Sequence, residues 1–357
     1  MIRLTAVLFI LVIGSTVSHA QSYKRPGNRV LVVSGGGARG AWGVGVARSL
    51  YETEGGYRAV FGTSTGSLMA PMILLQQFDS LEAYYTRVTQ KDIFSKNPFK
   101  VKTVNGTVTT ELKGFNAFWR LLWNKPTLGE TENLRRLIQK CFRPEDFATL
   151  KSRSDLSLHV AVTNMTNGQS EVKTSDDIGA YDEMVNWIWA SSNQPVFMSY
   201  TMMNGHPYVD GGVREVVPLR AAVVYAIKHR IDTIDVIVND SWEPQDKNWS
   251  VEKNKGYFKG GLMRVLDVYN ANTVYYDLRS AALMSTLHDE RVKAGTAEGS
   301  GLLTVIVYSM PDEVANQYKD ELGFDRVKMT EFVKKGKKFI REKEFVEGST
   351  LHVYRPR

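Results

Sequence analysis

The sequence predicts an α/β protein with a mostly parallel central sheet, and two observations lead to this fold class. Asn28 to Ser34 is an apolar strand without polar alternation, as expected for burial on both faces of a parallel sheet. Tyr57 to Phe61 is aromatic and β-branched, which suits a second buried strand. Each strand leads through a glycine-rich turn to an expected helix, one over Ala41 to Glu52 and one from Leu68, so the two form successive strand–helix units.

The two glycine-rich turns are expected at one edge of the sheet. Gly35 and Ser64 are 29 residues apart (64 − 35), which leaves room for one helix and one strand. Because parallel neighbouring strands bring their carboxyl ends together, the turns should meet where such folds build their sites.

The same patterns predict the remaining elements. Helices are expected over Phe78–Gln90, Glu130–Phe142, Met184–Ala190, Leu219–Lys228, Gly261–Leu287 and Asp325–Ile340. Strands are expected over Leu156–Val162, Glu171–Thr174, Pro207–Val209, Thr233–Val238 and Leu302–Tyr308. Asn167-Gly168 is the turn signal of a hairpin.

The first 20 residues have the pattern of a secretory signal peptide. Arg3 supplies the positive start, Leu4 to Ile13 a short apolar run, and Ser18-His19-Ala20 a cleavage site after Ala20. The apolar run is too short for a membrane anchor. We therefore expect an exported protein, periplasmic or secreted, whose residues 21–357 form one domain.

Composition narrows the class of partner. The 357 residues are 43% hydrophobic with a formal net charge of +7, as suits a globular protein drawn to anionic lipid surfaces. We find no zinc-finger spacing or long Arg/Lys run, so nucleic acid is not expected. No metal-ligand spacing is present either, and no metal is expected. The single cysteine, Cys141, cannot form an internal disulfide and is expected in the core.

Ser64 is the candidate nucleophile, because Gly62 and Gly66 flank it in a G-x-S-x-G pattern between a strand and a helix. Such a turn exposes the hydroxyl at a helix start, where backbone N–H groups favour negative charge. The alternative is a glycine-rich turn in which a serine caps the helix.

Gly35-x-Gly37-x-x-Gly40 can be read in two ways. After a strand and before a helix it matches the dinucleotide fingerprint, but that site needs a carboxylate at the end of the second strand, and none is present. As part of a hydrolase, the backbone N–H groups of this loop would instead stabilise an oxyanion.

Asp210, followed by Gly211 and Gly212, is the candidate base for the serine. Taken alone, this tripeptide has the composition of an ordinary turn. None of the five histidines of residues 21–357 lies in a stretch typical of a catalytic histidine, and only His206, close to Asp210, merits a test.

Four blocks in order resemble the patatin-like phospholipase family. They are Gly35 to Gly40, Gly62 to Gly66, Ala190 to Phe197 and Asp210 to Gly212; Asn193 departs from the usual small residue of the third block. The resemblance covers about residues 29–238 with specific motifs, and residues 239–357 only in general pattern. It implies a three-layer α/β/α fold and a metal-independent, cofactor-free Ser64–Asp210 dyad that cleaves acyl esters of lipids. A catalytically silent lipid-binding relative remains the alternative.

The resemblance also implies roles for the glycine-rich loop. Backbone N–H groups of Gly35, Gly36, Gly37 and Ala38 would form the oxyanion hole. Arg39 would meet either a lipid phosphate or the surface of its own helix.

Residues 91–125 interleave aromatic and basic side chains and have two readings. Phe115, Phe118, Trp119 and Trp123 with Arg120 and Lys125 suit an element that contacts an anionic membrane. Alternatively Phe115, Phe118, Trp119 and Leu122 share one helical face and fold inward as core.

Overall fold

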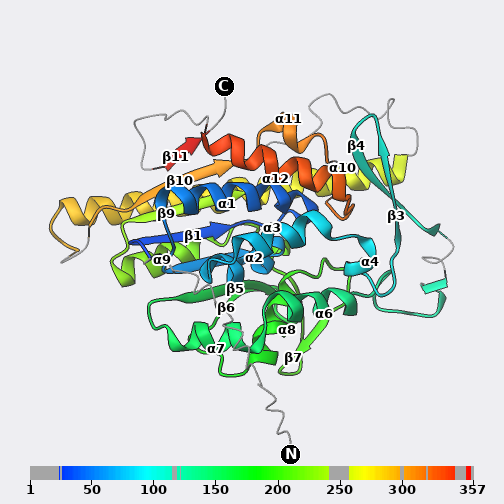
Figure 1. Cartoon of the computed structure of the whole chain (residues 1–357), viewed down its shortest axis with the longest axis horizontal. Coiled ribbons are helices and arrows are strands. Elements are labelled where there is room, and N and C mark those ends of the chain that lie inside the picture. Colours follow the sequence, from blue (N-terminus) through cyan, green and yellow to red (C-terminus); the bar gives the residue numbers. More distant parts are fainter. Residues whose placement is uncertain are drawn as a thin grey trace, which may run out of the picture.

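The computed structural model describes residues 24, 26–114, 119–120, 122–240, 257–297, 301–318, 321–341 and 351–354. Their strands form one large sheet and a separate hairpin, with helices on both faces of the sheet (Figure 1). The expected signal peptide, residues 1–20, lies outside the described residues.

The large sheet is mostly parallel, as predicted. Its parallel strands lie in the order β11 (Leu351–Tyr354), β10 (Thr304–Ser309), β9 (Thr233–Val238), β1 (Arg29–Val33), β2 (Ala59–Thr63) and β5 (Ser157–Asn164). Antiparallel to β5 run β6 (Gln169–Thr174) and β8 (His206–Asp210), and β7 (Thr201–Met203) pairs with β8. β1 and β2 are neighbours, so the two glycine-rich turns do meet at one edge.

Successive residues of β1 enter two different cores, which explains why the strand shows no polar alternation. Leu31 and Val33 pack in the core on the side of α1 (Gly40–Glu54), α2 (Thr65–Leu74), α3 (Phe78–Arg87), α8 (Tyr181–Ser191) and α12 (Arg326–Arg341). Val30 and Val32 pack in the core on the side of α9 (Leu219–His229) and α10 (Tyr257–Lys293). The predicted three-layer α/β/α arrangement is therefore confirmed.

β2 and β8 lie end to end along one side of β5. Ala161 of β5 pairs with Thr63 of β2, and the next residue, Val162, pairs with Asp210 of β8. β6 occupies the other side of both β5 residues, since Ala161 also pairs with Val172 and Val162 with Glu171. Because β8 runs antiparallel to β5, its last residue faces the end of β2, and the two strand ends meet.

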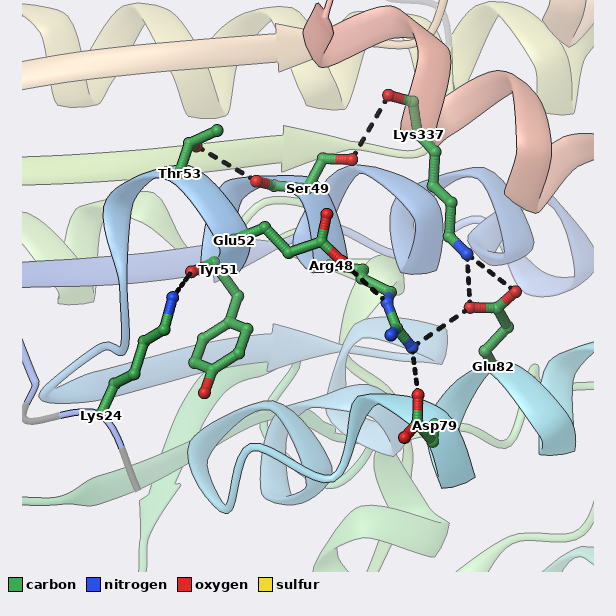
Figure 2. A network of polar contacts seen from close by, with 9 residues as sticks. All are labelled: Lys24, Arg48, Ser49, Tyr51, Glu52, Thr53, Asp79, Glu82 and Lys337. Atoms are coloured by element: carbon green, nitrogen blue, oxygen red, sulfur yellow. Dashed lines mark hydrogen bonds and ion pairs between the residues drawn. The ribbon is translucent and has the colours of Figure 1, made fainter. Parts of the chain in front are cut away.

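A polar network joins three helices on one face of the sheet (Figure 2). Arg48 of α1 contacts Asp79 at 2.5 Å and Glu82 at 3.5 Å, both on α3. Lys337 of α12 contacts the same Glu82 at 2.7 Å. α12 also packs close to α1, where a Cβ on Gly336 would lie 2.0 Å from the carbonyl oxygen of Trp42. Helix α12 is thereby fixed on α1, which follows the first glycine-rich turn, and on α3.

The remaining described elements follow in chain order. They are η1 (Gly37–Arg39), α4 (Gln90–Ile93), β3 (Phe99–Val104), β4 (Thr107–Leu112), α6 (Glu132–Cys141), α7 (Pro144–Ser152), η2 (Gly211–Val213) and α11 (Asp312–Ala315). The β3–β4 hairpin and β11 were not predicted from the sequence. None of the described helices combines the length and the apolar character needed to cross a bilayer.

Candidate active site

Ser64 occupies a sharp turn between β2 and α2. Its backbone has φ 55° and ψ −122°, a conformation that side-chain-bearing residues rarely adopt and that is typical of strained functional positions. The start of α2 lies close to β1, and only glycine fits there, because a Cβ on Gly66 would lie 2.1 Å from the carbonyl oxygen of Val33. The G-x-S-x-G segment therefore forms the sharp strand-to-helix turn that its spacing predicts.

The third sequence block holds the backbone of this turn. The N–H of Ser64 donates to the Ser191 hydroxyl at 3.0 Å, and that hydroxyl donates to the carbonyl oxygen of Ala161 at 2.6 Å. The Ser67 hydroxyl donates to the carbonyl oxygen of Ser64 at 2.7 Å. Both polar backbone groups of Ser64 are thus engaged, and the strained turn is fixed from α8 and α2.

Asp210 ends β8 and is buried, with 4% of its surface exposed. Its N–H donates to the carbonyl oxygen of Asn193 at 2.9 Å, and its Oδ1 accepts from the N–H of Gly212 at 2.8 Å. Asn193 is itself fully buried and accepts from the Thr131 hydroxyl at 2.6 Å. The departure from the family pattern at Asn193 therefore adds a buried anchor behind Asp210.

The Ser64 hydroxyl lies beside the Asp210 carboxyl, in the wall of the same pocket. Burial raises the pKa of the Asp210 carboxyl to about 6, although the neighbouring Ser64 hydroxyl and the hydrogen bond from the Gly212 amide favour the charged form. A carboxylate with a raised pKa is a stronger base than an exposed one. The pair can therefore transfer a proton from the hydroxyl to the carboxylate near neutral pH.

Two of the four expected oxyanion donors are engaged elsewhere. The N–H of Gly35 donates to the carbonyl oxygen of Val216 at 3.1 Å, and that of Ala38 to the carbonyl oxygen of Glu321 at 2.8 Å. Within the described part of the chain, the N–H groups of Gly36 and Gly37 have no hydrogen-bond partner. Gly36 and Gly37 therefore carry the two amides of this loop that remain available to an oxyanion.

Arg39 does not fit the expected contact with a lipid phosphate. Its side chain is buried, its Nε donates to the carbonyl oxygen of Tyr318 at 2.9 Å, and its guanidinium forms an ion pair with Asp240. Because the charge is compensated inside the protein, Arg39 connects the glycine-rich loop to the C-terminal part of the chain.

An apolar pocket opens beside Ser64 and Asp210. Ser64, Asp210 and Gly37 lie in its wall. The rest of the wall is mainly apolar and comes from α2, α3, α6, α12 and neighbouring loops, including Leu68, Met72, Leu81, Tyr85, Val88, Ile93, Leu134, Leu137, Ile138, Cys141, Phe142, Met198, Phe324 and Met329. Cys141 packs against the core, as expected, and also lines the pocket, where burial raises the pKa of its thiol to about 12.

The segment Glu321 to Phe324 covers part of the site and was missed from the sequence. Its Glu321 carbonyl accepts from Ala38, and the side chains of Gln194 and Gln90 donate to Glu321 at 3.2 Å and to the carbonyl oxygen of Leu322. Glu321, Leu322 and Phe324 all line the pocket. No local pattern marks this segment, because its role depends on contacts with residues nearly three hundred positions earlier.

The described histidines and acidic residues form neither a catalytic histidine site nor a metal site. His159 is buried against Phe61, with ring centroids 3.9 Å apart, and burial lowers its pKa to about 3. His206 is exposed and contacts the Thr166 hydroxyl at 3.1 Å. Among the described residues no histidine hydrogen-bonds to Ser64 or Asp210, and no group of three or more His, Cys, Asp or Glu side chains could hold a metal ion.

Comparison with known proteins identifies the family to which this α/β/α protein belongs. The family model described as Patatin-like phospholipase matches residues 31–223, more than half of the chain. The chain therefore belongs to the patatin-like phospholipase family, a family of lipid acyl hydrolases.

Individual relatives are distant. A search of curated proteins found no match. Among solved structures, the crystal structure of VipD from Legionella pneumophila matches with a TM-score of 0.35 and 11% identity, over 88% of this chain and 68% of that chain. A likeness this distant says nothing about the activity of this chain.

Proposed function

We propose that the protein is a serine esterase of the phospholipase A type, in which Asp210 is the base for Ser64. The observation that carries this proposal is the position of the Ser64 hydroxyl beside the buried Asp210 carboxyl in the wall of an apolar pocket. The substrate class that fits is a lipid with a fatty-acyl ester, because such a chain is apolar and its ester carbonyl can reach Ser64.

The proposed reaction has two halves. Asp210 takes the proton of Ser64 as Oγ attacks the ester carbonyl carbon, and the N–H groups of Gly36 and Gly37 stabilise the oxyanion. The start of α2 adds a favourable field for the developing negative charge at Ser64. The alcohol leaves with the proton from Asp210. Asp210 then takes a proton from water, the resulting hydroxide attacks the acyl-serine, and Ser64 recovers its proton as the fatty acid leaves.

The length of the pocket supports a medium acyl chain. Its wall follows one face of α2 from Ser64 through Thr65 and Leu68 to Met72. Eight residues of helix advance about 12 Å, at 1.5 Å per residue. An extended chain with C–C bonds of about 1.5 Å covers this distance with roughly nine carbons. Longer chains would have to bend or leave the pocket through its opening.

Residues 119–125 support a contact with the membrane surface. Trp119, Leu122 and Trp123 are exposed to 36%, 60% and 67%, and the two indole rings lie 5.4 Å apart. Lys96, Lys113 and Lys125 surround the same surface hollow. The aromatic and cationic mixture suits the acyl and phosphate layers of an anionic bilayer. Phe115 and Phe118 lie outside the described residues, so the inward reading of the segment is not tested for them.

We retain the export of the protein as part of the proposal. The pattern of residues 1–20 supports cleavage after Ala20, and the basic composition suits work at an anionic lipid surface. The amino-terminal sequence of protein recovered outside the cytoplasm would begin at Gln21 if this is right.

The alternative functions are weaker. A dinucleotide would need a carboxylate after β2, where Ser64 stands, and polar walls where this pocket is apolar. A silent lipid-binding relative would need neither the strained backbone at Ser64 nor a buried carboxyl beside the serine hydroxyl.

Hydrolysis of a lipid panel by the Ser64→Ala variant tests the proposal. Wild type should release fatty acid from phospholipid vesicles or mixed micelles, and Ser64→Ala should release none while keeping its far-UV circular dichroism and affinity for the lipid. Equal turnover in the two proteins would disprove the role of Ser64. Binding without turnover in wild type would favour the silent relative.

A further inference from the structure

The long helix α10 has apolar side chains on two opposite faces. Its inner face, with Ala271, Val274, Leu278 and Ala281, is buried against the sheet and α9. Its outer face exposes five large apolar side chains, Val265, Tyr269, Tyr276, Leu283 and Leu287, to 63%, 46%, 55%, 59% and 65%. We call these five residues the α10 stripe. At about 100° of turn per residue they fall within roughly 40° of arc, opposite the buried face.

The α10 stripe is too regular for scattered surface hydrophobics. Single exposed apolar residues are ordinary, but a contiguous apolar patch on a soluble surface marks an interaction site. The stripe extends over 22 residues of helix, about 33 Å at 1.5 Å per residue. α10 runs along the far side of the sheet in Figure 1, away from the helices that form the pocket. No stripe residue lines the pocket, although the Tyr269 hydroxyl donates to the carbonyl oxygen of Val213, three residues after Asp210, at 2.7 Å.

The spacing of the α10 stripe is symmetric about Tyr276. The intervals from Val265 to Leu287 are 4, 7, 7 and 4 residues. If a second α10 lay antiparallel on the first, with a two-fold axis at Tyr276, Val265 would face Leu287 and Tyr269 would face Leu283. Tyr276 would face its own copy. Such self-complementarity is what an isologous two-fold interface requires, and spacings of four and seven are those of packed helix pairs.

Charge and area fit the same pairing. In this register Arg279 would face Thr273 of the second copy, so no like charges oppose each other there. Within its own helix, Nη1 of Arg279 donates to the Tyr275 hydroxyl at 3.0 Å. Five half-exposed large side chains, with Val268 and Tyr275 beside them, offer roughly 600 Å² per copy, given on the order of 150–250 Å² for an aromatic side chain. Two copies would bury about 1,200 Å², at the lower end of specific interfaces.

We propose that the α10 stripe is the interface of an antiparallel homodimer of this chain. The contact is modest in area, so the dimer should dissociate at low protein concentration. Its two pockets would open away from the interface. The proposal does not depend on the proposed activity, since its residues take no part in the candidate active site.

Site-specific disulfides test both the pairing and its direction. Tyr276→Cys should form a disulfide-linked dimer under mild oxidation. A mixture of Val265→Cys with a tagged Leu287→Cys should form the mixed dimer in preference to either self-linked dimer. Wild type, which keeps the Cys141 thiol, and Val224→Cys, on the exposed face of α9, serve as controls and should remain unlinked. Preferential linkage of Val265→Cys to itself would overturn the antiparallel register.

Sedimentation velocity tests the association itself. Wild type should change from a monomer to a dimer between roughly 1 and 100 μM, and Leu283→Arg should stay monomeric with unchanged circular dichroism. A wild type that is monomeric throughout this range would overturn the proposal. If Leu283→Arg self-associates to the same extent as wild type but no longer binds vesicles, the proposal would also be overturned. The α10 stripe would then be assigned to a membrane.

Discussion

Asp210 is the residue on which the candidate site depends most, because its burial opposes its own charge. The neighbouring Ser64 hydroxyl and the hydrogen bond from the Gly212 amide favour the carboxylate, yet burial dominates and raises the pKa of Asp210 to about 6. The carboxyl is fully ionised only above that pH. We therefore expect kcat/KM to rise with pH along an acid limb near pH 6, as a base in the free enzyme would produce.

The same shift predicts how Asp210 affects stability. A carboxyl whose folded pKa lies above its unfolded value of about 3.9 stabilises the fold at low pH, and this contribution is lost as pH rises through about 6. Asp210→Asn removes the buried charge but keeps a hydrogen-bonding side chain. Its melting temperature should therefore equal or exceed that of wild type at pH 8, with a smaller difference at pH 4. A variant less stable at pH 8 than at pH 4, relative to wild type, would contradict the buried charge.

At the scale of elements, α2 serves both the nucleophile and the pocket. It starts at Ser64, and its face from Thr65 to Met72 follows the pocket wall. A change one or two turns from Ser64 can therefore alter chain length preference without touching the dyad.

Met72→Trp should shorten the acyl chain that the protein accepts. The larger side chain would fill the far part of the pocket, so kcat/KM for p-nitrophenyl esters of twelve or more carbons should fall about tenfold or more, while the butyrate ester should change little. Val224→Trp, on the exposed face of α9, is the matched control. Equal losses for long and short esters would mean that the pocket does not hold the acyl chain.

The segment after the β3–β4 hairpin gives a second prediction at this scale. If Trp119 and Trp123 enter a bilayer, replacing both by alanine should weaken binding to anionic vesicles and slow hydrolysis of vesicle lipid, with a short soluble ester unaffected. If they stabilise the fold, the melting temperature should drop by several degrees and both substrates should be hydrolysed more slowly. Vesicle binding that is unchanged in the double variant and insensitive to salt would exclude this contact.

Over the whole molecule, the sequence predicted the features that arise from local pattern. Strand–turn–helix units fixed the expectation for β1, α1, β2 and α2, and the Asn167-Gly168 turn predicted the β5–β6 hairpin. The β3–β4 hairpin was not predicted, although the Asn105-Gly106 dipeptide is a hairpin-turn signal and adopts φ values of 48° and 75° in the structure. The interleaved aromatic and basic residues of 91–125 favoured a membrane-contacting element or a helical face instead of two strands.

Contacts between distant parts of the chain could not be predicted. The meeting of β2 and β8 along β5 depends on an antiparallel pairing, which no periodicity near Asp210 encodes. Two further contacts also join distant parts of the chain: the Glu321 carbonyl accepts from the Ala38 amide, and Asp240 pairs with Arg39. Together with the Val216 carbonyl on the Gly35 amide, these contacts bear on two expectations, the number of free amides in the glycine-rich loop and the role of Arg39.

The most direct test of the Ser64–Asp210 pair is the rate and position of labelling by a fluorophosphonate, measured by intact mass and peptide mapping. We predict one adduct, on Ser64 in wild type, and labelling of Asp210→Asn slower by about a hundredfold, in the range typical for loss of a general base. His206→Ala should label at the wild-type rate. Labelling of another serine, or an unchanged rate in Asp210→Asn, would contradict the pair as the reacting groups.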